Sequence, residues 1–233
     1  MQQFFVEELK APWLDKKQRQ QCLKVLRMRK GDRVRLVDSK GNGVIAEFTQ
    51  DDLETMEIVE PITWPDKKRK LRIIASMIRN ERLEWMIQKA CECGVDEIVL
   101  YSAQHGVVRD FGSREDRKLE RLNLIAKEAC EQSYRNIQVP VIKPIELNEI
   151  KSYMSDLNVF ADIGEAPHFV ECVNEDTTTI TAFVGPEGGI STSERQQLFD
   201  MGFIEVSLGN NVLRAETASI YLCNMVSVCE VIR

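Results

Sequence analysis

Residues 183–191 read FVGPEGGIS, an apolar run followed by a turn that holds three glycines, a proline and a carboxylate. Glycines let a planar ligand approach the backbone closely, and Pro186 stiffens the turn. The loop has neither the lysine of a phosphate-binding P-loop nor the glycine spacing of a dinucleotide site, and Glu187 would repel a phosphate. ATP and NAD are therefore disfavoured. The alternative is a purely structural connection in which Ser191 and Glu194 form a capping box for the next helix.

A second candidate loop lies within residues 206–219, VSLGNNVLRAETAS. Gly209 follows a strand-like run, and Arg214 precedes the final predicted helix. A guanidinium there could stabilise developing negative charge, although a single arginine is more often a surface charge. Ligands of open α/β sheets bind beyond the carboxyl ends of strands, where both loops are expected. Both loops are therefore candidates for ligand binding.

The elements that position the loops alternate strand and helix beyond residue 70. Leu83, Met86, Ile87 and Ala90 share one helical face, and Gly94 follows as a C-terminal glycine. Strands buried on both faces that alternate with helices predict a mostly parallel sheet in an α/β fold. Strands are expected at 71–78, 95–101, 157–162, 180–185 and 204–209, and the main helices at 81–93, 114–133 and 215–232.

The first seventy residues instead predict a small β-rich domain. A basic helix over 16–28 is expected to turn Leu23, Leu26 and Cys22 inward, and the turn at 39–43 to use positive φ at Gly41 and Gly43. Pro61 and the polar run at 64–70 read as a linker, which places a domain boundary near residue 70. Strands are expected at 4–9, 32–38, 44–50 and 56–60.

Charge is distributed unevenly. The net charge is −6, yet residues 16–35 hold nine Lys and Arg against one acid. This distribution indicates a small basic module attached to an acidic body. The basic run either binds a polyanion or is only a solvated face. The seven cysteines, among them Cys91, Cys93, Cys130, Cys223 and Cys229, lie mostly in apolar runs and predict buried thiols and no metal site. No run suits a signal peptide or a membrane span, so a cytoplasmic protein is expected.

The motifs GPEGGIS (185–191) and VSLGNNVLRAETAS (206–219) together closely resemble the RsmE family of ribosomal RNA methyltransferases in the SPOUT superfamily. LKVLRMRKGDRV (23–34), QKACECGVDEIV (88–99) and AKEACEQSYR (126–135) extend the resemblance over essentially the whole chain. It implies a PUA-like RNA-binding β-barrel domain over 1–68. A SPOUT methyltransferase domain with a C-terminal deep trefoil knot would follow over 69–233, in a homodimer.

The implied activity is methyl transfer from S-adenosyl-L-methionine to N3 of a uridine in 16S ribosomal RNA, within the small ribosomal subunit. Uridine N3 is a weak nucleophile until its proton leaves. Arg214 and Glu187 are the catalytic candidates, and Glu187 either accepts that proton or holds its loop. Cofactor binding is expected at Val184, Gly185, Pro186, Gly188, Gly189, Ile190, Leu208, Gly209, Asn211 and Leu213. RNA binding is expected at Lys24, Arg27, Arg29, Lys30, Arg79, Gln132 and Arg135.

The chain departs from the family pattern near Gln21 and Cys22, at His105 and at Tyr134, which concerns RNA contacts more than the cofactor site. Two other functions compete. One is a SPOUT methyltransferase that modifies a ribose 2′-oxygen or transfer RNA, and the other is a noncatalytic RNA-binding module. The LRAETA motif disfavours the first, and the intact glycines with Arg214 disfavour the second. Neither DNA nor a membrane is an expected partner.

Overall fold

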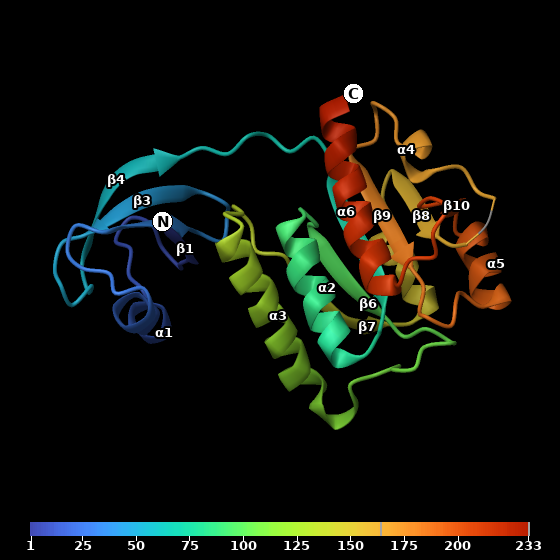
Figure 1. Cartoon of the computed structure of the whole chain (residues 1–233), viewed down its shortest axis with the longest axis horizontal. Helices are drawn as coiled ribbons and strands as arrows, with labels where there is room; N and C mark the ends of the chain where they lie inside the picture. Colours follow the sequence, from blue (N-terminus) through green and yellow to red (C-terminus); the bar gives the residue numbers. More distant parts are fainter. Residues whose placement is uncertain (164, 233) are drawn as a thin grey trace. The chain divides into compact units, whose positions relative to one another are not determined.

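A computed structural model of the chain describes residues 1–163 and 165–232, which divide into two compact units (Figure 1). Unit 1 combines Met1–Asp66 with Lys127–Gln138, and unit 2 combines Lys67–Ala126 with Val139–Arg233. The main division falls close to the predicted boundary near residue 70. The inclusion of Lys127–Gln138 in unit 1 was not predicted, because it depends on contacts between distant parts of the chain.

Unit 1 contains a four-stranded sheet in the order β1-β2-β3-β4. The first strand runs parallel to the second, and the other neighbours are antiparallel. Phe4, Leu36, Ala46 and Phe48 fill its core. The strands are β1 (Gln2–Phe5), β2 (Arg33–Val37), β3 (Gly43–Phe48) and β4 (Met56–Ile62).

Pro61 lies within β4 and not in a linker, so this part of the prediction is wrong. The strand forms the edge of the sheet, where a missing backbone N–H is tolerated. In the preceding turn Gly41 has the expected φ of +84°. Gly43 does not have the expected positive φ. Packing requires a glycine there, since a Cβ would lie 2.2 Å from the Trp64 ring.

The basic helix differs from its prediction. α1 (Lys16–Gln20) continues as the π-helix η1 (Gln21–Val25). Cys22 is buried, but Leu23 and Leu26 are 38% and 40% exposed. The inward placement of the two leucines is therefore wrong, because the wider π-helical winding rotates them away from the face that a regular α-helix would bury.

Lys127–Gln138 joins unit 1 through hydrogen bonds to the first strand. Gln3 Nε2 donates to the Arg135 carbonyl at 2.7 Å, and the Phe5 amide donates to Glu131 Oε1 at 3.0 Å. The Arg35 guanidinium also lies 4.9 Å from the Tyr134 ring centroid. These contacts fix the C-terminal end of α3 (Glu115–Gln132) in unit 1.

Unit 2 is built on a six-stranded sheet whose neighbouring strands all run parallel, which confirms the predicted α/β class. β7 was not predicted, because Lys143 and Pro144 interrupt its apolar run at the sheet edge. The spatial order is β10-β8-β9-β5-β6-β7. The strands are β5 (Lys70–Ser76), β6 (Glu97–Tyr101), β7 (Val141–Ile145), β8 (Leu157–Ala161), β9 (Thr179–Val184) and β10 (Ile204–Val206).

Helices flank this sheet (Figure 1). α2 (Asn80–Glu92) buries Leu83, Met86, Ile87 and Ala90 as predicted, and Gly94 follows with φ +97°. α2 packs against α6 (Ala215–Ile232), which lies along β5 and β9. Leu198 of α5 (Thr192–Asp200) belongs to a core cluster that also contains Phe160 of β8 and Phe183 of β9. Shorter helical segments are η2 (Gly112–Arg114), η3 (Leu147–Tyr153) and α4 (Phe169–Cys172).

Two further sequence expectations concern cysteines and membranes. Cys91, Cys130, Cys223 and Cys229 are buried as predicted, whereas Cys93 is half-buried. None of the described helices has the length and apolar character needed to cross a bilayer.

Candidate functional site

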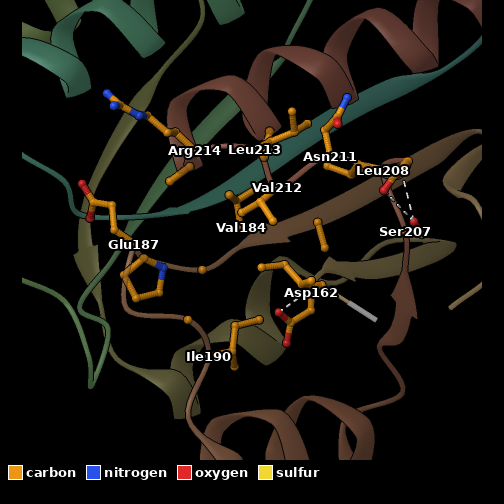
Figure 2. A pocket seen from close by; sticks show the side chains of 18 of the residues that line it. Asp162, Val184, Glu187, Ile190, Ser207, Leu208, Asn211, Val212, Leu213 and Arg214 are labelled. Carbon is orange, nitrogen blue, oxygen red and sulfur yellow. Dashed lines mark hydrogen bonds between the residues drawn. The ribbon is translucent and has the colours of Figure 1, made fainter. Parts of the chain in front are cut away.

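A pocket of ≈ 720 Å³ opens at the carboxyl ends of three neighbouring strands of unit 2 (Figure 2). Its walls are the segments that follow β8, β9 and β10. The parallel sheet brings these strand ends to one edge, where ligands of such sheets bind. The lining comprises residues 161–163, 184–190 and 207–215, together with Ala218.

The structure brings the two predicted loops together in this pocket. All ten residues expected to bind the cofactor line it, and so do Glu187 and Arg214. The ten are Val184, Gly185, Pro186, Gly188, Gly189, Ile190, Leu208, Gly209, Asn211 and Leu213.

The loop after β9 is tightly packed. Gly189 donates its amide to the Pro186 carbonyl at 2.9 Å, which closes the turn. A Cβ at Gly185 would lie 2.6 Å from Ile190 Cγ1, and one at Gly188 would lie 2.9 Å from the His105 carbonyl oxygen. Side chains at Gly185 and Gly188 would therefore displace this wall of the pocket.

A buried carboxylate anchors the end of this loop. The Ser191 amide donates to Glu194 Oε2 at 2.9 Å, and the Glu194 amide donates to Ser191 Oγ at 3.2 Å, as the predicted capping box requires. Glu194 Oε1 also accepts hydrogen bonds from the Tyr101 hydroxyl at 2.7 Å and the Gln104 amide at 2.8 Å. Burial opposes ionisation of Glu194, but these hydrogen bonds outweigh it and lower its pKa. The network ties the loop to the end of β6.

A third wall was missed in the sequence. Asp162 lies just beyond β8 and accepts a hydrogen bond from Arg195 Nη2 at 3.0 Å. Figure 2 shows its side chain among those that line the pocket. A polar residue at the end of the predicted strand 157–162 was a usable signal, because the strand-end rule applied to the other loops holds here too.

Arg214 and Glu187 lie on the same side of the pocket in the view of Figure 2. Arg214 is exposed, and no hydrogen bond or ion pair joins its guanidinium to another residue of the described ranges. Glu187 Oε1 instead accepts a hydrogen bond from Arg82 Nη1 at 3.3 Å. Within the pocket lining Arg214 is the only cationic side chain, so it is well placed to meet negative charge in a bound substrate.

The predicted RNA-binding residues are divided between the units. Lys24, Arg27, Arg29 and Lys30 are exposed in unit 1, and none has an ion pair with another described residue. Gln132 and Arg135 also belong to unit 1, although they were expected in the catalytic domain. Arg79 is exposed in unit 2, at the N-terminus of α2.

Two other arginines of the basic segment are already paired. Arg33 Nε lies 2.8 Å from Glu47 Oε2, and Arg19 forms an ion pair with Glu54. Arg19 and Arg33 are therefore less available to a polyanion than the four predicted cations of unit 1.

The chain is similar to known RNA methyltransferases. The family model of the RNA methyltransferase domain matches residues 65–227, which include the whole pocket, so the fold and the site define an RNA methyltransferase domain. Ribosomal RNA small subunit methyltransferase E of Bacillus subtilis (strain 168) is 30% identical over 218 residues, covering 87% of this chain and 84% of that protein. The protein of the same name from Mesomycoplasma hyopneumoniae (strain 232) is 30% identical over 168 residues, covering 71% and 73%.

A solved structure agrees with these relatives. Ribosomal RNA small subunit methyltransferase E of Neisseria gonorrhoeae, bound to S-adenosyl methionine, superposes with a TM-score of 0.87 at 29% identity, covering 98% of this chain and 97% of that one. The chain belongs to the ribosomal RNA small subunit methyltransferase E family.

Proposed function

We propose that this protein uses S-adenosyl-L-methionine to methylate 16S ribosomal RNA of the small subunit. The observation that carries the proposal is the single pocket formed by both signature loops at the carboxyl edge of the sheet. The relatives' shared name and the S-adenosyl methionine bound to the Neisseria gonorrhoeae protein support the same activity and cofactor.

The residues of the pocket fit this cofactor. Its volume of ≈ 720 Å³ lies within the range of small-molecule sites. Val184, Ile190, Leu208 and Leu213 supply apolar surface for an adenine ring, while loop backbone groups can bond its polar edge. Side chains at Gly185 and Gly188 would meet Ile190 and His105, so the shape of this pocket wall depends on the two glycines. When bound, the cofactor supplies the methyl group.

We propose N3 of a uridine as the acceptor. This nitrogen must lose its proton before it becomes a good nucleophile, so the site has to stabilise the resulting negative charge. Arg214 is assigned to that role because its guanidinium is exposed at the pocket and unpaired within the described residues. Glu187 has two possible roles, as proton acceptor or as the group that holds its loop, and the hydrogen bond from Arg82 supports the second.

Unit 1 is proposed to bind RNA as a PUA-like domain, with the boundary between domains near residue 68. Its exposed cations Lys24, Arg27, Arg29 and Lys30 would contact phosphates and position the substrate, while the pocket reads the base. The sequence resemblance further supports a deep trefoil knot in the C-terminal segment, a homodimer, a cytoplasmic location and a substrate within the small ribosomal subunit.

A thermal-shift titration tests the cofactor proposal. S-adenosyl-L-methionine and S-adenosylhomocysteine should each raise the unfolding temperature, because a ligand that binds only the native state stabilises it. ATP and NAD should have no effect. If neither sulfur compound stabilises the protein, the proposed function is wrong.

A further inference from the structure

Arg82 in the first turns of α2 reaches two carboxylates that belong to two different segments of the site. Its Nη1 lies 3.3 Å from Oε1 of Glu187, in the loop after β9. Its Nε lies 3.8 Å from Oε1 of Glu216, in the first turn of α6. One side chain therefore links the loop after β9 to the first turn of α6, which Arg214 directly precedes.

The carboxylate of Glu216 is stabilised by its ion pair with Arg82. Its side chain is only 9% exposed, and its Oε2 is buried with no hydrogen-bond partner among the described residues. A buried carboxylate with few partners is costly to keep ionised unless a cation lies nearby. Arg82 is the only cation that forms an ion pair with Glu216 within the described ranges.

Glu187 and Glu216 are both paired with Arg82, whereas Arg214 has no ion pair among the described residues. Arg214 lies two positions before Glu216 and lines the same pocket as Glu187. Without Arg82, both carboxylates would attract the guanidinium of Arg214.

We infer that Arg82 is a positioning residue that holds Glu187 and Glu216 and so keeps the Arg214 guanidinium available to the substrate. This inference rests on the proposed function, because it assigns the freed guanidinium to the uridine.

α2 does not need Arg82 in order to pack. The helix buries Leu83, Met86, Ile87, Ala90 and Cys91, and the Arg82 side chain is 37% exposed. Arg82→Ala should therefore fold. Lys89→Ala is the matched control, because Lys89 lies on the same helix, is 34% exposed and pairs with Glu92 at 2.8 Å.

Steady-state kinetics of methyl transfer give the first test. Arg82→Ala should lower kcat about 10- to 100-fold, the range that misplacement of a catalytic group produces, with KM for the cofactor within about twofold of wild type. Arg82→Lys should recover part of the loss because it restores the charge. Lys89→Ala should match wild type. An Arg82→Ala variant with wild-type kcat would overturn the inference.

A double variant separates positioning from a general loss of structure. Arg82→Ala/Glu216→Gln removes one of the two charges that would attract Arg214, so it should be more active than Arg82→Ala alone. If the double variant is no more active than the single one, the inference is wrong.

A chemical test does not depend on activity. Phenylglyoxal modifies accessible, unpaired guanidinium groups, and mass spectrometry locates the modified residues. Arg214 should react readily in the wild type and in Lys89→Ala, slowly in Arg82→Ala, and at an intermediate rate in the double variant, where Glu187 still attracts it. Equal reactivity of Arg214 in wild type and Arg82→Ala would overturn the inference even if the proposed function were correct. A wild type that transfers no methyl group would contradict the proposed function alone.

Discussion

Gly188 lies directly against the backbone of His105, so close that a Cβ at position 188 would come within 2.9 Å of the His105 carbonyl oxygen. The hydrogen bond from Gln104 to Glu194 fixes the neighbouring backbone of this segment. The carbonyl therefore cannot retreat easily, and the shape of the loop after β9 depends on the absence of a side chain at position 188.

Gly188→Ala should weaken binding of S-adenosylhomocysteine by about tenfold or more, since a displacement of the loop worth 1.4 kcal/mol would suffice. Isothermal titration calorimetry measures the affinity. The unfolding temperature of the ligand-free variant serves as the control and should fall by only a few degrees. Unchanged affinity would show that this loop does not shape the cofactor site.

Glu194→Gln should lower the free energy of unfolding at pH 7 by about 1–3 kcal/mol, because it weakens hydrogen bonds to a buried charged group. The folded state lowers the pKa of Glu194, so its ionisation stabilises the protein above the pKa of the unfolded chain. This contribution disappears as pH falls through the lower pKa of the folded protein. Urea unfolding from pH 7 to acid should show the difference between wild type and variant shrinking. A difference that grows on acidification would contradict the assigned direction.

Replacement of exposed cations in unit 1 should weaken RNA binding through electrostatics. Arg27→Ala and Arg29→Ala should each reduce the slope of log K against log salt by about 1, as expected for the loss of one phosphate contact. Arg33→Ala is the matched control, because Arg33 is paired with Glu47 in the same segment. Equal slopes for Arg27→Ala and Arg33→Ala would remove Arg27 from the interface.

Arg214→Ala should abolish methyl transfer while the affinity for S-adenosylhomocysteine stays within about threefold of wild type, since the guanidinium is assigned to the developing charge and not to the cofactor. Transfer assays and calorimetry on one preparation separate the two effects. Full activity of the variant would remove Arg214 from the mechanism.

The sequence predicted the parallel sheet and two walls of the pocket, because buried strands leave continuous apolar runs and the glycine loops follow them directly. It did not reveal β7, where Lys143 and Pro144 interrupt the apolar run. The exposure of Leu23 and Leu26 was missed because the π-helix departs from the regular period. Arg82 gave no local signal either, since its two partners lie 105 and 134 positions away in the sequence. Features that arise from long-range contacts require the folded structure.

The most direct test of the proposed activity is transfer from labelled S-adenosyl-L-methionine to assembled small subunits and to naked 16S ribosomal RNA, followed by mapping of the modified nucleotide. The expected result is label on N3 of a single uridine with the wild type and none with Arg214→Ala. Label on a ribose oxygen or on transfer RNA, or no transfer to either ribosomal substrate, would contradict the account.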